Sequence, residues 1–190
     1  LGDVYKRQGP TPFGDGVVNE EDLFILAEYL EKDVYDPTLI AHWTLDETQG
    51  IVSFDSIGGN DGIVTGIPLW QTDGGQVDGA LELDGASFVV TDFVLNPSDG
   101  PFSVLAWVRD GMPGQAIISQ VDGVNWLMTD AATGALMTEL KSGGRLGKPL
   151  CSDAIITDDV WHRVAFTWDG SARRLYVDSI LAVSYTHLTL

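Results

Sequence analysis

The chain has 190 residues, of which 10 are Lys or Arg and 28 are Asp or Glu, so its formal net charge at pH 7 is −18. A surface this acidic repels phosphate backbones and anionic lipids, which argues against nucleic-acid binding. No apolar run approaches the roughly 18 residues that a membrane span needs. A hydrophobic content of 44% suits the core of one domain, and 22 Gly with 9% aromatic residues favour a turn-rich, all-β chain.

The two ends of the chain differ from their neighbours in composition and in pattern. Residues 1–8 (LGDVYKRQ) and 184–190 (SYTHLTL) resemble translated adapter or vector sequence of the kind that recurs at the ends of metagenomic reading frames. We therefore treat both segments as artefacts, leave them out of the fold prediction, and expect that the natural chain was cut at both ends. Because the chain opens with Leu and lacks a signal-like segment, this end does not indicate a localisation.

Residues 9–36 predict a loop followed by a short helix. Leu23, Leu26, Ala27 and Leu30 follow helical spacing, and Asn19 is a suitable cap for the first turn. A helix here is expected to end before Asp36, because the residue that precedes a proline is pushed out of the helical conformation. Residues 37–39 then form a linker.

This loop and helix resemble half of a dockerin repeat, in which an EF-hand-like loop enters a helix. The resemblance implies a calcium site and a cohesin-type partner protein. Its ligands would be Asp15, the carbonyl of Val17, Asn19 and Asp22. Thr11 and Phe13 stand where the family supplies Asp or Asn, so the expected affinity is low. The alternative is a capped amphipathic helix that binds no metal.

From residue 40 onwards the chain predicts an antiparallel β-sandwich. Eight of its nine Asp-Gly pairs fall after Leu39, between short apolar runs, and such pairs favour tight turns. Residues 102–109 are partly apolar on both faces, so we expect them to form a central strand. The other expected strands are 40–45, 80–83, 88–90, 116–121, 126–128 and 135–140.

The clearest pattern lies between Trp161 and Asp178. Val164, Phe166 and Trp168 alternate with more polar neighbours, and a second run places Leu175 and Val177 on one face. The turn Asp169-Gly170-Ser171 separates the two runs. This is the period-two pattern of a β-hairpin with one buried face.

The segment WHRVAFTWDG followed by LYVD resembles the hairpin of laminin-G-like domains in the concanavalin A-like lectin/glucanase superfamily. AHWTLDETQG, NDG at 60–62, GALELDG at 79–85, FSVLAWVR and IISQ match further landmarks of that family in the same order. The resemblance covers residues 40–183 and implies a concanavalin A-like jelly roll.

Two departures from the family pattern carry expectations of their own. Ser179 replaces the usual Gly after Asp178, so a strained turn is expected there. The family's last strands have no counterpart, so the sandwich is expected to be truncated at its C-terminal side, with an unpaired edge and an exposed apolar patch.

Because the superfamily includes glucanases, an enzyme must be considered. Such enzymes place paired carboxylates on one strand face. Glu82 and Asp84 come nearest to that pattern but lack a second Glu, and the adjacent Asp46 and Glu47 would face opposite sides of a strand. No Ser/His/Asp set or metal-ligand spacing stands out, so we expect no catalysis.

The remaining residues of chemical interest have structural interpretations. His42 is expected on a strand surface, His162 is expected to be structural, and His187 falls in the suspect C-terminal segment. Cys151 is expected to be a small, partly buried apolar residue.

The six tryptophans divide into two predicted groups. Trp43, Trp107, Trp161 and Trp168 occupy strand positions that the family fills with core aromatics. Trp70 and Trp126 lie in less regular stretches and are the candidate contacts for stacking on a sugar. Relatives often hold a calcium ion in the sandwich, for which Asp46 and Asp84 are conceivable but unspecific ligands.

The resemblance implies a non-catalytic binding or adhesion module of a secreted or cell-surface bacterial multi-domain protein. Its expected partner is a carbohydrate or another extracellular polymer. Two alternatives stay open: a structural spacer domain, or a fragment of a concanavalin A-like polysaccharide hydrolase or lyase. This functional expectation rests on the fold family, and one fold serves many functions.

Overall fold

A computed structural model describes residues 38–92, 94–96, 99–120, 124–142, 145–146 and 148–186. The predicted artefact at residues 1–8 and the predicted calcium loop and helix at 9–36 lie outside these residues. The chain divides into two compact units, residues 1–40 and 41–190, and the strands described below all belong to the second. No helix among the described residues is long and apolar enough to cross a membrane.

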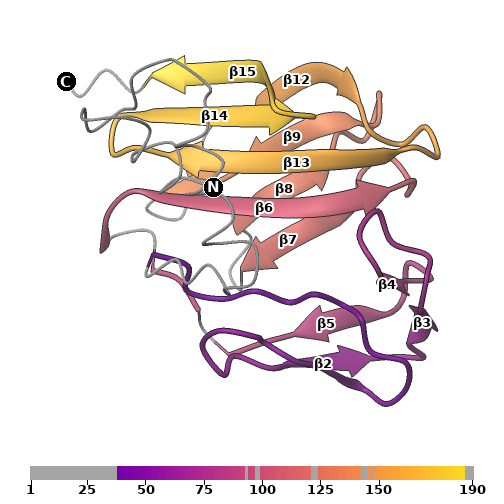
Figure 1. The fold of residues 1–190 in the computed structure, drawn as a ribbon. Helices are drawn as coiled ribbons and strands as arrows, with labels where there is room; N and C mark the ends of the chain where they lie inside the picture. The colour runs from indigo at the N-terminus through magenta and orange to yellow at the C-terminus, as the bar shows by residue number, and fades with distance from the viewer. Residues whose placement is uncertain are drawn as a thin grey trace, which may run out of the picture. The chain divides into compact units, whose positions relative to one another are not determined.

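Two four-stranded antiparallel sheets dominate the described part of the second unit (Figure 1). In the front sheet, which faces the viewer in Figure 1, the strand order is β15-β14-β13-β6. These strands are β6 (Phe102–Arg109), β13 (Trp161–Trp168), β14 (Ala172–Val177) and β15 (Ile180–Thr186). The back sheet has the order β12-β9-β8-β7, formed by β7 (Ala116–Gln120), β8 (Val124–Thr129), β9 (Ala135–Glu139) and β12 (Leu150–Ile155).

Short strands complete the described structure. They form the sheet β1-β2-β5 and the hairpins β3-β4 and β10-β11. Their bounds are β1 (Val52–Ser53), β2 (Gly62–Thr65), β3 (Leu69–Gln71), β4 (Ala80–Glu82), β5 (Phe88–Val90), β10 (Lys141–Ser142) and β11 (Arg145–Leu146).

The core lies between the front and back sheets. Its buried members are Leu127, Leu136, Leu150 and Ile156 on the side of the back sheet, and Val164, Phe166, Leu175 and Val177 from the front sheet. Phe102 contacts both sides, with its ring 5.5 Å from that of Trp126 and 5.6 Å from that of Phe166. Burial of apolar side chains from two facing sheets is the main source of stability in a sandwich. The predicted all-β antiparallel sandwich is confirmed.

The register of β6 and β13 decides which side chains face the core. Val104 lies opposite Phe166, on the inner face, whereas Trp107 lies opposite Arg163, on the outer face. Because directly opposed residues in a sheet share a face, the period-two pattern in the sequence extends across both strands. The predicted hairpin of β13 and β14 is confirmed, with Val164 opposite Val177 and Phe166 opposite Leu175.

The prediction that residues 102–109 form a central strand is wrong for the described sheet. β6 is its edge strand, and the described strands include no neighbour on its far side. The apolar outer face of β6 therefore does not reflect burial on both sides. Instead, Leu105 is 60% exposed and Trp107 is 43% exposed.

The opening strand predicted at residues 40–45 is reduced to a single bridge between Trp43 and Asp55. The backbone N–H of His42 donates to the Asp55 carboxylate at 2.8 Å, and the carbonyl of His42 accepts from Ser56 N–H at 2.9 Å. A side chain thus takes the place of a strand partner, and the ladder does not extend.

The last described strand extends past the predicted boundary at residue 183. In β15, Ser184 lies opposite Arg174, and the strand reaches Thr186. The assignment of residues 184–190 to an artefact stays a prediction, because strand pairing does not report the origin of a sequence. The turn that precedes β15 has φ of 51° at Asp178 and 71° at Ser179, so the strained turn predicted at Ser179 is confirmed.

Candidate functional site

The outer face of the front sheet is the candidate site, because it exposes aromatic and cationic side chains together. The inner side chains of the same strands are packed into the core, so the outer side chains are held at fixed spacings on a pleated surface. Here "outer face" denotes Leu105, Trp107 and Arg109 on β6, Trp161, Arg163, Ala165 and Thr167 on β13, Arg174 and Tyr176 on β14, and Leu181 and Ser184 on β15.

Trp107 is the exposed aromatic residue on β6, and two arginines are its neighbours on the sheet. Arg163 lies directly opposite it on β13, and Arg109 is two residues further along its own strand. Opposed side chains start about 5 Å apart, and alternate residues of one strand start about 7 Å apart. The indole of Trp107 can stack on a flat ligand, and neighbouring guanidinium groups can donate hydrogen bonds to the edge of that ligand.

The two arginines have different local partners. The guanidinium carbon of Arg109 lies 5.3 Å from the centre of the Trp161 ring. Arg163 donates from Nη2 to the Ser179 hydroxyl, and its backbone N–H donates to Asp178 Oδ1 at 2.9 Å. Arg174, further across the outer face, forms an ion pair of 2.5 Å with Asp169. Its charge is therefore already neutralised by a neighbour.

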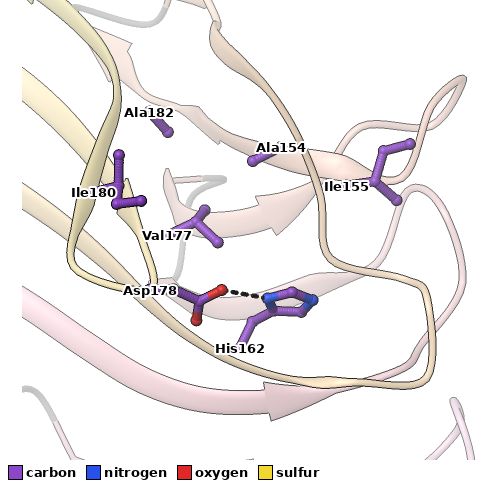
Figure 2. A pocket seen from close by; sticks show the side chains of 7 residues that line it. All are labelled: Ala154, Ile155, His162, Val177, Asp178, Ile180 and Ala182. Atoms are coloured by element: carbon purple, nitrogen blue, oxygen red, sulfur yellow. Dashed lines mark hydrogen bonds and ion pairs between the residues drawn. The ribbon is translucent and has the colours of Figure 1, made fainter.

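A small cavity of about 300 Å³ lies at one end of the front sheet, beside β12 (Figure 2). It is lined by Ala154, Ile155, His162, Val177, Asp178, Ile180 and Ala182. Most of the lining is apolar, and the polar part is the pair of His162 and Asp178. Figure 2 shows these two side chains bonded to each other, with the apolar side chains around them.

His162 is held between two carboxylates. Its Nδ1 lies 2.8 Å from Asp178 Oδ2, and its Nε2 lies 3.0 Å from Asp158 Oδ1. Burial of the ring acts to lower the pKa of His162, but the hydrogen bonds and charges of Asp178 and Asp158 outweigh it and raise that pKa. Both ring nitrogens are occupied, so this histidine has no free nitrogen with which to act as a general base or a metal ligand. The arrangement fits the structural role predicted for His162.

The structure separates the two tryptophans that the sequence proposed as ligand contacts. Trp126 is only 8% exposed, and its ring packs against Phe102 in the core. To stack on a ligand, it would have to leave that position. Trp70 lies half-buried on β3 and donates from Nε1 to the carbonyl of Gly50 at 2.8 Å. The structure does not bring Trp70 and Trp126 together in one contact, and their role in binding stays a prediction.

The other four tryptophans are also distributed differently from the prediction. Trp168 is half-buried and packs against the core, as expected. Trp43 is half-buried and donates from Nε1 to the carbonyl of Asn60 at 2.9 Å. Trp107 and Trp161 lie on the outer face, so the prediction that they are core residues is wrong. A strand position alone does not distinguish the inner face from the outer one.

The carboxylates weighed for catalysis support loops and strands. Asp84 has a lowered pKa, first because of the hydrogen bond with the Ser87 side chain and then because of those that it accepts from the N–H groups of Ala86 and Ser87. Asp46 accepts from Gly79 N–H at 2.8 Å, Glu47 accepts from Phe54 N–H at 2.7 Å, and Glu82 accepts from Gln71 Nε2 at 2.9 Å. Each of these carboxylates has a local structural role.

The predicted metal ligands Asp15, Val17, Asn19 and Asp22 lie outside the described residues, as does His187. Within the described residues, no group of three or more His, Cys, Asp or Glu side chains is placed to hold a metal ion. His42 is exposed, as predicted. Cys151 is exposed rather than partly buried, because it lies on β12 with its side chain pointing away from the core.

Comparison with known proteins identifies the family. A family model described as the concanavalin A-like lectin/glucanases superfamily matches residues 83–189. The chain belongs to this superfamily. No curated protein sequence matches the chain.

A solved structure of similar fold is domain 4 of AbnA, a GH43 extracellular arabinanase from Geobacillus stearothermophilus, in complex with arabinotriose. It has 21% identity and a TM-score of 0.57, and the comparison covers 80% of this chain and 76% of that chain. At this identity the similarity establishes a shared fold alone.

Trp107 is the candidate functional residue that was not predicted from the sequence. The signal was present, since Trp107 alternates in phase with Ser103 and Arg109 rather than with Val104 and Val108. When a tryptophan lies on the same face of a strand as an arginine and a serine, the pattern indicates that this face meets solvent. The prediction instead followed the family pattern, which has a core aromatic residue at this strand position.

Proposed function

We propose that this chain is a non-catalytic carbohydrate-binding module and that the outer face of the front sheet is its binding surface. The observation that carries the proposal is the exposure of Trp107 on a rigid strand, with Arg109 and Arg163 beside it. Aromatic rings offer a large, flat apolar surface at little cost in conformational entropy, which suits stacking on the apolar face of a sugar ring. Arginine side chains beside the ring would orient the hydroxyl groups of the ligand.

The absence of catalysis is part of this proposal. The carboxylates that came nearest to a glycosidase pattern accept hydrogen bonds from the chain's own N–H groups, and His162 is bonded at both nitrogens. Such engagement favours a structural use of these groups over acid–base catalysis.

Carbohydrate is the ligand class to test first because the domain of AbnA with a similar fold was solved with arabinotriose bound. A secreted or cell-surface multi-domain protein is the setting in which such a module would act, and we include it in the proposal. An extracellular polymer with repeated rings would contact several positions of the outer face at once. Contacts that are weak individually would then give a higher overall affinity.

The experiment is affinity electrophoresis of the full chain in gels that contain neutral and acidic soluble polysaccharides. Wild type is expected to be retarded by at least one polymer, and Trp107→Ala is expected to abolish the retardation. Trp70→Ala is the matched control, since it removes an indole that bonds to Gly50 at another place in the fold. Retardation that survives Trp107→Ala and is lost in Trp70→Ala would contradict the assignment to the outer face. Migration unaffected by any polymer would contradict carbohydrate binding.

A further inference from the structure

We propose that the outer face selects polysaccharides whose sugar rings carry carboxylates, that is, uronate polymers. This inference rests on the proposed function and adds the chemical class of the ligand. In it, Trp107 stacks on a sugar ring, and the guanidinium groups of Arg163 and Arg109 bind ring carboxylates.

The first argument is the distribution of charge. The chain has only 10 basic residues against 28 acidic ones. Nevertheless, two arginines are the neighbours of Trp107 in the sheet, and none of the strand residues that form the outer face is Asp or Glu. A positive patch on so acidic a chain attracts anions locally, because carboxylates further away than about 10 Å are screened at 0.1 M salt.

The second argument is that neither of these two charges is held in a close ion pair by the protein. Within the described residues, neither Arg109 nor Arg163 takes part in an ion pair. Arg109 lies over the Trp161 ring, and the guanidinium of Arg163 contacts a neutral hydroxyl. Each guanidinium therefore keeps N–H donors for a ligand anion.

Two carboxylates that border the outer face bind other groups. Asp178 Oδ2 is bonded to His162, and Asp178 Oδ1 accepts the backbone N–H of Arg163. Asp169 is paired with Arg174 through a contact of 2.5 Å. The charge of Arg163 does help to lower the pKa of Asp178, but neither carboxylate forms an ion pair with the guanidinium of Arg163 or of Arg109.

The third argument is geometric. In a uronate the carboxylate is attached directly to the sugar ring, so it lies at the rim of a ring that stacks on an indole. Arg163 and Arg109 are the neighbours of Trp107 in the sheet, one on the adjacent strand and one along the same strand, and both side chains are long enough to reach a ligand stacked on that ring. Guanidinium and carboxylate match in a planar, two-point hydrogen bond. A neutral sugar would use the stacking surface but leave both charges without a partner.

The experiment is isothermal titration calorimetry of the full chain at about 0.1 M salt, the concentration at which screening reaches about 10 Å. The probes are polygalacturonate and its methyl ester, which have the same backbone and differ in the carboxylate charge. Neutral arabinan and dextran sulfate are the other two ligands. We expect polygalacturonate to bind at least about tenfold more tightly than its ester, the effect of losing one charge-assisted hydrogen bond.

The variants locate the effect. Arg163→Gln and Arg109→Gln are each expected to weaken polygalacturonate binding about tenfold while leaving the ester unaffected. Lys148→Gln is the matched control, because this exposed cation lies between β11 and β12, outside the outer face. It is expected to change the affinity by less than about twofold, since the charge that it removes is not on the proposed binding surface. Circular dichroism confirms that each variant is folded.

Equal affinity for polygalacturonate and its ester would overturn the inference, as would tighter binding of dextran sulfate or an affinity insensitive to Arg163→Gln. If arabinan binds and depends on Trp107 but not on either arginine, the uronate assignment fails and the proposed function stands. If none of the four polymers binds, the proposed function fails with it.

Discussion

Trp107 and Arg163 lie directly opposite each other in β6 and β13, on the face of the front sheet that points away from the core. This pairing places an exposed aromatic ring beside a cation that has no ion-pair partner among the described residues. In the same structure Trp126 occupies the core position that family comparison assigns to strand tryptophans. The roles expected for these two tryptophans are therefore exchanged, and their substitutions should have opposite consequences.

Trp126→Ala should destabilise the fold strongly. The indole is buried against Phe102, and removing a buried large aromatic side chain costs about 3–5 kcal/mol. Trp107→Ala should lower the free energy of unfolding by less than about 1 kcal/mol, because much of its ring is already in water. Chemical denaturation followed by circular dichroism measures both. A larger loss for Trp107→Ala than for Trp126→Ala would contradict the placement of the two rings.

Ser179→Gly should stabilise the protein by about 0.5–1 kcal/mol. Asp178 and Ser179 form the two-residue turn between β14 and β15, and both have positive φ. A residue with a Cβ is strained there by about 1–2 kcal/mol, which is offset in part by the greater freedom of Gly in the unfolded chain. The gain in midpoint on urea denaturation tests this. Ser171→Gly, at the turn between β13 and β14, is a control for the loss of a serine. Ser179→Gly also removes the hydrogen bond that Arg163 donates to Ser179, so a decrease in midpoint would show that this loss outweighs the relief of strain.

The contribution of His162 to stability should fall as pH rises. Its pKa is raised above the ordinary value of about 6.5 by Asp178 and Asp158, after burial has acted in the opposite direction. A raised pKa in the folded state means that the charged form is favoured by folding. The stabilisation is therefore complete below about pH 6.5 and is lost as pH rises through the folded pKa. Asp178 and Asp158 have lowered pKa values, chiefly through their bonds to His162, so their contribution is lost when pH falls below about 4.

His162→Gln provides the comparison for this prediction. The difference in melting temperature between wild type and His162→Gln should be greater at about pH 5.5 than at about pH 8.5, because this stabilisation is complete below the ordinary pKa of histidine and is lost as pH rises. A difference for His162→Gln that is independent of pH would contradict the ion-pair geometry.

Arg173→Met should leave the free energy of unfolding unchanged or raise it by about 1 kcal/mol. The side chain is only 5% exposed, and burial lowers its pKa. Nη2 donates to the carbonyl of Lys148 at 3.2 Å, but Nε is buried without a partner, and no carboxylate pairs with it among the described residues. Replacing a poorly compensated buried charge by an apolar side chain of similar length is often neutral or favourable. A loss of more than about 2 kcal/mol on denaturation would show that the charge is well compensated.

The hairpin of β13 and β14 could be predicted from sequence because its faces differ clearly in polarity. Val164 and Phe166 on β13 are two residues apart, as are Leu175 and Val177 on β14, and Val164, Phe166 and Leu175 are fully buried. Local pattern was sufficient there because one sheet face packs on the core and the other meets solvent.

The outer face could not be predicted in the same way. Ser103 and Arg109 share the phase of Trp107 and indicate solvent, but Leu105 and Trp107 have the composition of a buried face. Whether another layer covers them depends on strands that are distant in sequence. The pairing of His162 with Asp158 and Asp178 likewise depends on the register of the hairpin and on the loop before β13. Trp126 lies in β8, where buried and less buried positions do not alternate regularly. The sequence pattern therefore did not indicate that the Trp126 side chain faces the core.

The most direct test of the central claim is a titration followed by two-dimensional ¹H–¹⁵N NMR of the six tryptophan indole groups. Trp107→Phe and Trp126→Phe assign the two signals that matter, and oligogalacturonate is the titrant. We predict that the Trp107 signal shifts progressively and saturates, while the Trp126 signal stays in place. A Trp107 signal that does not move while other indole signals shift would place the binding surface elsewhere on the fold and contradict the account.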